Sequence, residues 1–159
     1  MTLSPKTPIL VGSGQSLQRP NDPRTASFDT AADPVALMDE AIRLATADAG
    51  LTSLPSLDAL RVVGLLSWKY GNPAWLIAQD LGVSSREYAL SAMGGNTPQS
   101  LVNAAALEIH NGQAAIIVLT GGESTRTKAR AKKAGEQLTW RKTGADVPAP
   151  TAVGIPSNK

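Results

Sequence analysis

Three segments of the chain carry the same start and stop signals for an α-helix, and these signals constrain the fold more than any other feature. Each segment begins with a hydrogen-bond acceptor followed by proline and ends at glycine: Asp33-Pro34 to Gly50, Asn72-Pro73 to Gly82, and Thr97-Pro98 to Gly112. The acceptor can satisfy a free N–H of the first turn, where proline is tolerated, and glycine can adopt the left-handed exit. The sequence therefore predicts three helices.

Four short apolar runs of strand length alternate with these helices, at residues 8–12, 59–66, 87–92 and 114–120. The last run is continuously apolar from Ala114 to Leu119, which is typical of a strand covered on both faces. Strands that alternate with helices favour a parallel sheet with helical crossovers. We therefore predict an α/β domain in which four strands and three helices follow in βαβαβαβ order and helices cover a mostly parallel sheet.

The chain divides by composition at the end of the fourth predicted strand. Residues 1–122 hold all the periodic segments and are expected to form the α/β core. Residues 123–159 begin with a basic segment, and from Thr143 to Lys159 the chain is rich in Pro, Gly, Thr and Asn. We expect this tail to be loosely ordered.

Composition excludes several classes of site. The chain has no cysteine, which rules out disulfides, thiolate metal sites and a thiol nucleophile, and the single histidine, His110, rules out a histidine-pair metal site. We therefore expect no metal. No stretch approaches the ~20 apolar residues that span a bilayer, and the first eight residues do not resemble a secretion signal. The expectation is a cytoplasmic protein without membrane contact.

Charge is concentrated in one segment. The segment from Glu123 to Lys142 contains seven cationic and two anionic side chains, so its net charge is +5. Because the whole chain has a net charge of +2, the rest of it carries −3. A basic segment on a slightly acidic domain favours a phosphate-bearing partner. Nucleic acid is the less favoured partner, because Trp140 is the only aromatic residue among these cations. A solvated cationic helix without a ligand is the structural alternative.

The junction between the third predicted strand and the third predicted helix is the strongest candidate for a ligand site. It reads Met93-Gly94-Gly95-Asn96-Thr97-Pro98-Gln99-Ser100. The two glycines allow a close approach of backbone or ligand, and the helix beyond them presents free N–H groups. Such a turn can hold a carbonyl oxygen, a thioester or a phosphate. A tight turn without a ligand remains the alternative.

Residues 93–124 resemble the nucleophile region of the thiolase superfamily. In that family a strand leads into Cys-x-Ser-Gly, an alanine-rich helix, and a strand that ends in Gly-Gly-x-Glu-Ser. This chain carries the later parts as Asn103-Ala104-Ala105-Ala106, Gly112 and Gly121-Gly122-Glu123-Ser124. The runs Leu65-Leu66-Ser67-Trp68 and Gly94-Gly95-Asn96-Thr97-Pro98-Gln99 are similar to the acetyl-CoA acetyltransferase-type branch related to sterol-carrier-protein thiolases. The resemblance extends from about residue 8 to residue 140.

The resemblance implies an acyl-CoA-binding N-terminal half of a thiolase-like acyltransferase, in lipid metabolism, that takes a coenzyme A thioester as substrate or ligand. It also implies a homo-oligomer or a complementary second thiolase half. Gly95 stands at the position of the family's nucleophilic cysteine, so no covalent acyl-enzyme can form there. We therefore expect the chain to be inactive alone. A non-catalytic interaction or oligomerisation subunit, or half of a thiolase-fold retro-aldolase, remains as the alternative.

The resemblance also singles out the binding residues. Gly94, Gly95, Asn96 and Thr97 would hold the thioester. The basic segment corresponds to the start of the family's loop region, so Arg126, Lys128 and Arg130 are candidates for contacts with the CoA phosphates. His110 lies about three turns along the helix from Gly95, which is too far for a base at that turn.

Overall fold

Helices and strands alternate along the chain in the computed structural model, which describes residues 4–19, 22–23 and 27–154. The elements are α1 Pro34–Asp48, β1 Leu57–Val62, α2 Pro73–Leu81, β2 Ser85–Ser91, α3 Thr97–His110, β3 Ile117–Thr120, α4 Thr125–Ala134 and β4 Thr151–Val153. The three helices expected from their start and stop signals are α1, α2 and α3.

The strands of the described chain form a four-stranded sheet in the order β3-β1-β2-β4, with every pair parallel. At its centre, Leu60 of β1 lies between Tyr88 of β2 and Val118 of β3. The α/β class and the parallel sheet predicted from the sequence are confirmed. Strand β1 is central because the crossover through α2 places β2 on one side and the crossover through α3 places β3 on the other.

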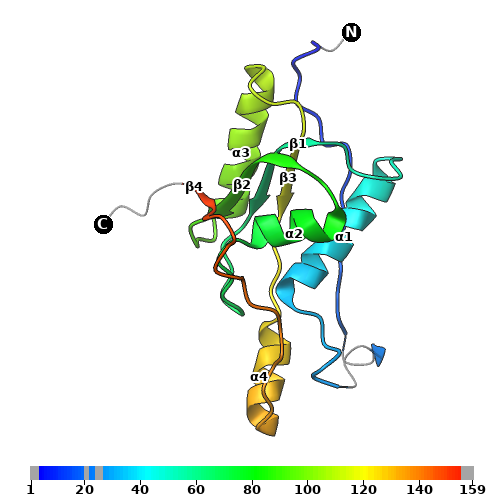
Figure 1. Cartoon of the computed structure of the whole chain (residues 1–159). Coiled ribbons are helices and arrows are strands. Elements are labelled where there is room, and N and C mark those ends of the chain that lie inside the picture. Colours follow the sequence, from blue (N-terminus) through cyan, green and yellow to red (C-terminus); the bar gives the residue numbers. More distant parts are fainter. Residues whose placement is uncertain (1–3, 20–21, 24–26, 155–159) are drawn as a thin grey trace.

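Helices cover both faces of this sheet (Figure 1). Helices α1 and α2 pack on one face around a core that includes Met38, Leu60 and Ile77, all at most 1% exposed. Helix α3 lies on the opposite face, where Arg61 of β1 bonds Glu87 at 2.7 Å and Glu108 of α3 at 2.9 and 2.8 Å. The buried guanidinium is thus fully paired, as a charge at 5% exposure requires.

The helix caps agree with the sequence at α1 and α2 but not at α3. The carboxylate of Asp33 accepts from Ala36 N at 2.7 Å, and the amide oxygen of Asn72 accepts from Trp75 N at 3.0 Å. Helix α3 begins at Thr97 itself, so Thr97 is not its cap. Its N-cap is Asn96, whose side chain makes no capping hydrogen bond within the described chain. The first turn of α3 therefore lacks the side-chain acceptor that α1 and α2 possess.

The first predicted strand, residues 8–12, is not a strand. Its apolar residues are exposed, with Leu10 at 87%, and the segment runs beside α1 rather than in the sheet. A Cβ at Gly12 would lie 2.2 Å from the carbonyl oxygen of Ala45, and Ser13 N donates to the Asp48 carboxylate at 2.8 Å. The close fit to the helix, made possible by glycine, takes the place of strand pairing.

The tail expected to be loosely ordered is held in place as far as the structure describes it. Trp140 packs edge-on against Trp68 at 5.2 Å, the Thr143 hydroxyl accepts from Gly71 N at 2.7 Å, and Asn72 donates to Pro148 O at 3.0 Å. Strand β4 then pairs with β2. The prediction is wrong for residues 143–154, because these contacts come from distant parts of the chain; residues 155–159 lie outside the described residues. Residues 140–153 are called the strap below.

Candidate functional site

A cavity of about 650 Å³ opens at the C-terminal edge of the sheet, between the ends of β1 and β2. Its lining comes from the segment after β1, the end of β2, helix α4 and the strap: Gly64, Leu65, Leu66, Trp68, Lys69, Tyr70, Leu90, Ser91, Met93, Lys128 and Lys142. It is called the basic cavity, because three lysines and no carboxylate belong to this lining. Its volume is in the range of small-molecule sites.

The topology of the sheet explains why the cavity lies here. The chain leaves β1 toward α2 on one face and leaves β2 toward α3 on the opposite face, so the two neighbouring strand ends diverge. Ligands of open α/β sheets bind at such a switch point, beyond the carboxyl ends of the strands. The basic cavity is therefore at the position where this class of fold places its ligand sites.

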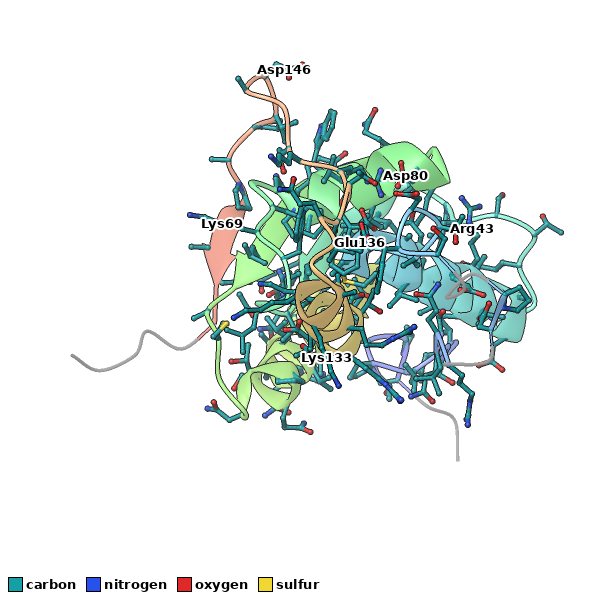
Figure 2. All side chains as sticks on the ribbon, turned by 90° about the horizontal axis from the view of Figure 1, so that it is seen from below. Arg43, Lys69, Asp80, Lys133, Glu136 and Asp146 are labelled. Atoms are coloured by element: carbon teal, nitrogen blue, oxygen red, sulfur yellow. The ribbon has the colours of Figure 1, made fainter. Side chains whose placement is uncertain are left out.

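The three lysines that line the basic cavity belong to three separate segments of the chain. Lys69 follows β1, Lys128 lies on α4 and Lys142 lies in the strap. Figure 2 looks onto this edge of the molecule and labels Lys69, together with Lys133 and Glu136 at the far end of α4. All three lining lysines are exposed, while Leu65, Trp68 and Tyr70 give the cavity an apolar wall. The arrangement suits a ligand that joins an anionic group to an apolar one.

Close packing of the backbone forms the floor of the cavity. A Cβ on Gly64 would lie 2.7 Å from the carbonyl oxygen of Ser91, so only glycine fits without a shift. The Ser91 hydroxyl accepts from Gly64 N and donates to Ala92 O, both at 2.9 Å. Because this hydroxyl is buried and already has both partners, it is structural rather than a free nucleophile.

A second cavity of about 510 Å³ lies between the end of β3 and the beginning of α3. Its lining is Val63, Gly64, Pro98, Leu101, Val102, Leu119, Thr120, Gly121, Gly122 and Glu123. It is called the apolar cavity, because Thr120 and Glu123 are the only polar side chains of this lining. Gly64 lines both cavities, so the two adjoin at the end of β1.

The carboxylate of Glu123 accepts hydrogen bonds from the segment that follows β1. It accepts from Leu66 N at 2.6 Å and from Ser67 N at 2.8 Å, while Ser124 N donates to the Ser67 hydroxyl at 2.9 Å. Partial burial opposes ionisation, but the hydrogen bonds from the side chain and backbone of Ser67 and from Leu66 outweigh it and hold the pKa of Glu123 below its ordinary value. The carboxylate is thus ionised and engaged at neutral pH, which favours a structural role over that of a proton donor.

The turn of residues 94–97, singled out by sequence, lies in the chain between one residue of each cavity. Met93 before it lines the basic cavity, and Pro98 after it lines the apolar cavity, whereas Gly94, Gly95, Asn96 and Thr97 line neither. The first three are exposed and Thr97 is buried. Apart from its two chain neighbours, no described residue has an atom within 4 Å of a Cβ built on Gly95, and its φ lies outside the left-handed region. Position 95 therefore faces open space that a side chain could enter.

The basic residues predicted from the sequence to bind phosphate differ in whether they line a cavity. Arg126, Lys128 and Arg130 are exposed on α4, and only Lys128 lines a cavity. Arg130 instead lies over the Phe28 ring, 5.7 Å from its centroid. Sequence reasoning missed Lys69. It also counted Lys142 as part of the basic segment without placing it in a site, because neither lysine belongs to a recognisable motif.

Two further observations limit the chemistry. The described residues contain no group of three or more His, Cys, Asp or Glu side chains that could hold a metal ion. His110 is exposed at the end of α3 opposite to the Gly95 turn, which a helix of 14 residues places roughly 20 Å away. Neither metal nor imidazole chemistry is therefore supported at this turn by the described residues.

No helix in the described part of the chain has the length and apolar character needed to cross a bilayer. Comparison with protein-family models, curated proteins and solved structures finds nothing that matches the chain. Its function has to be inferred from its own residues and their geometry.

Proposed function

We propose that this chain binds acyl-coenzyme A thioesters and forms the N-terminal half of a thiolase-like acyltransferase assembly in the cytoplasm. The observation that carries the proposal is one cavity, at the switch point of the sheet, that is lined both by Lys69, Lys128 and Lys142 and by apolar side chains. A CoA thioester joins phosphates to a largely apolar arm and an acyl group, which matches lysines beside Leu65 and Trp68. The resemblance of residues 93–124 to the thiolase nucleophile region supports the same ligand.

The turn of residues 94–97 would hold the thioester carbonyl in this proposal. It begins α3, and Asn96 leaves the first turn of that helix without a side-chain acceptor. Thr97 N and Ser100 N donate to Gly94 O and Asn96 O, and Pro98 has no N–H, so Gln99 N is the group of this turn that would stabilise a partial negative charge on the thioester oxygen. Arg126 and Arg130 line neither cavity, so they would add only to the general positive charge of α4 near the phosphates.

Catalysis by the isolated chain is not expected. Gly95 offers no sulfur and Ser91 is engaged in two hydrogen bonds, so no acyl-enzyme forms at either residue. A second half or subunit would have to supply acid–base groups, for acyl transfer or for carbon–carbon cleavage of the retro-aldol kind. The missing nucleophile equally favours a non-catalytic subunit that binds CoA or mediates assembly. Thioester turnover by residues 1–159 alone would contradict both readings.

The free edge of the sheet supports a partner. Within the described chain, β3 pairs only with β1, and its outer edge has no neighbouring strand. Exposed apolar residues also occur on α3 and just before β3: Val102 at 49%, Leu107 at 62% and Ile116 at 38%. Such an edge favours association with a second copy or with a complementary half. Light scattering of the purified chain, alone and with any complementary half, measures this directly.

The binding proposal is tested by calorimetric titration of coenzyme A and acetyl-CoA. In a Lys69→Gln/Lys142→Gln variant we expect roughly 2- to 30-fold weaker binding, because an exposed ion pair contributes about 0.2–1 kcal/mol. The matched control is Lys132→Gln/Lys133→Gln, which removes the same charge from the far part of α4, outside both cavities. Equal weakening in both variants would indicate only a diffuse charge effect, and absence of binding to the unsubstituted chain would refute the proposal.

A further inference from the structure

We propose that a phosphate-bearing ligand in the basic cavity holds the strap closed through Lys142, so that ligand binding and closure of the strap are coupled. The inference rests on the proposed function for the cavity that the ligand enters, and it adds a conformational response to that binding. It starts from the position of Lys142, which belongs both to the strap and to the lining of the basic cavity. The other two lysines of this lining, Lys69 and Lys128, lie outside the strap.

The beginning of the strap is firmly held. Trp140 is buried, and its Nε1 donates to Ala31 O at 2.8 Å. The guanidinium of Arg141 binds the Asp80 carboxylate through two nitrogens, at 2.6 and 2.9 Å, and its Nε lies 3.5 Å from Asp33 Oδ2. Two parallel bonds between a guanidinium and a carboxylate fix the geometry as well as adding energy. Residues 140 and 141 are therefore a fixed point from which the rest of the strap extends.

The remainder of the strap is held by few contacts, and these are near the surface. No residue from 142 to 154 is buried. The Thr143 hydroxyl accepts one hydrogen bond from Gly71 N at 2.7 Å, Pro148 O accepts one from Asn72 at 3.0 Å, and the three residues of β4 then pair with β2. Figure 2 shows the chain around Asp146 projecting from the edge of the molecule. Because segments with little buried surface open at a low cost in free energy, this part of the strap can separate from the segment after β1.

An unpaired charge connects this movable part of the strap to the basic cavity. Within the described residues, neither Lys69 nor Lys142 forms an ion pair. Lys128 helps to lower the pKa of Glu123, but that carboxylate already accepts from two backbone N–H groups. Since the lining contains no carboxylate, the three lysines repel one another. A phosphate bound among them replaces this repulsion with attraction, and it draws Lys142 and the strap toward the cavity.

The backbone N–H of Gly71 reports whether the strap is closed. Gly71 is exposed, and within the described chain the Thr143 hydroxyl is the only acceptor of this N–H. Its hydrogen therefore exchanges with solvent when the strap separates from the segment after β1. A ligand slows this exchange only by as much as its affinity differs between the closed and the open strap. That difference is the contribution of Lys142, and a single exposed ion pair changes an equilibrium constant roughly 1.4- to 5-fold.

The test is amide hydrogen exchange of the full chain, followed by NMR at constant ionic strength. Inorganic pyrophosphate or coenzyme A is added at concentrations that saturate binding in calorimetry. With either ligand, we expect the Gly71 N–H to exchange roughly 1.4- to 5-fold more slowly. The Ser13 N–H is the matched internal control, because it too is exposed and held by one side-chain acceptor, Asp48 at 2.8 Å, outside both cavities. Its exchange rate should not change.

Two variants show whether the effect passes through the strap. In Lys142→Gln the strap has no charge to bind the ligand, so the slowing at Gly71 should disappear. Lys133→Gln removes the same charge from the end of α4, outside both cavities, and should retain the slowing. Both lysines are exposed, so both variants should fold. By thermodynamic linkage, Lys142→Gln should also weaken ligand binding by the factor that is lost at Gly71.

The other outcomes separate this inference from the proposed function. Unchanged exchange at Gly71 in a chain that binds coenzyme A would refute the coupling and leave the proposed function intact. Equal slowing at Ser13, or undiminished slowing at Gly71 in Lys142→Gln, would also refute the coupling, because the ligand would then act on the whole fold or through another contact. Slowing by pyrophosphate without any binding of coenzyme A would support the coupling and refute the proposed ligand. Failure of both ligands to bind would refute the inference and the proposed function together.

Discussion

A buried carboxyl group next to a second, more exposed one should make the stability of this protein fall as pH rises through neutrality. Asp39 of α1 is 8% exposed and shares a hydrogen bond with Asp80 at the end of α2. Burial, followed by the hydrogen bond and the charge of Asp80, raises the pKa of Asp39 from 3.8 to about 8. Asp80 stays ionised because Arg141 of the strap binds its carboxylate at 2.6 Å and the charge of Arg43 also lowers its pKa. Arg43 and Asp80 are labelled in Figure 2, and Arg43 donates to the backbone oxygen of Asp80 at 3.0 Å.

The sign of the effect follows from the two states of Asp39. In the unfolded chain this carboxyl loses its proton near pH 4, whereas in the folded protein it keeps the proton up to about pH 8. Between these values the folded state binds more protons, so the free energy of unfolding falls by up to about 1.4 kcal/mol per pH unit. The lowered pKa of Asp80 acts in the opposite sense, but only in acid below its unfolded value. The window for Asp39 is therefore about pH 5 to 8.

The perturbation that isolates this effect is Asp39→Asn, since an amide can donate to Asp80 as the protonated carboxyl does but does not titrate. Urea denaturation at several pH values from 5 to 8 should show a falling free energy of unfolding for the unsubstituted chain. For Asp39→Asn we expect a flatter profile and higher stability at pH 8. Asp146→Asn, at an exposed position, is the control and should keep the unsubstituted slope. Equal slopes in the unsubstituted chain and Asp39→Asn would refute the reasoning.

Three further substitutions test other parts of the structure. Gly95→Cys should fold with unchanged stability or with a gain of about 0.4–1 kcal/mol, because its Cβ enters open space and its φ suits an L-residue. Alkylation with iodoacetamide, followed by mass spectrometry, should show an accessible thiol. A protected thiol would contradict this placement. Gly64→Ala should lower the free energy of unfolding by about 1–3 kcal/mol, because its Cβ would lie 2.7 Å from Ser91 O; an unchanged denaturation midpoint would contradict this fit. Arg61→Ala should cost about 3 kcal/mol in the same assay, because it leaves the carboxylates of Glu87 and Glu108 together without their shared cation, and a loss below 1 kcal/mol would show that solvent compensates them.

One part of the candidate site can be predicted from local sequence patterns and another part cannot. The turn at Gly94 and Gly95 is recognisable because two glycines stand between an apolar run and a helix start. The cavity beside it is not recognisable in this way. Lys69 and Lys142 line the same cavity only because the segment after β1 and the strap come together at one edge of the sheet. The spacing of Lys69 and Lys142 along the chain therefore does not predict that they are close in space.

By itself, the sequence determined α1, α2, α3 and the α/β class, because a cap such as Asp33 and an exit such as Gly82 act on the nearest turn of backbone and need no distant partner. Only the tertiary structure decided which extended segments became strands. Residues 8–12 are apolar yet lie against α1, whereas Thr151–Val153 pairs with β2 from within a stretch that looks like a loop. Strand pairing joins residues far apart in the chain, so the partner, rather than the segment's own composition, settles the outcome.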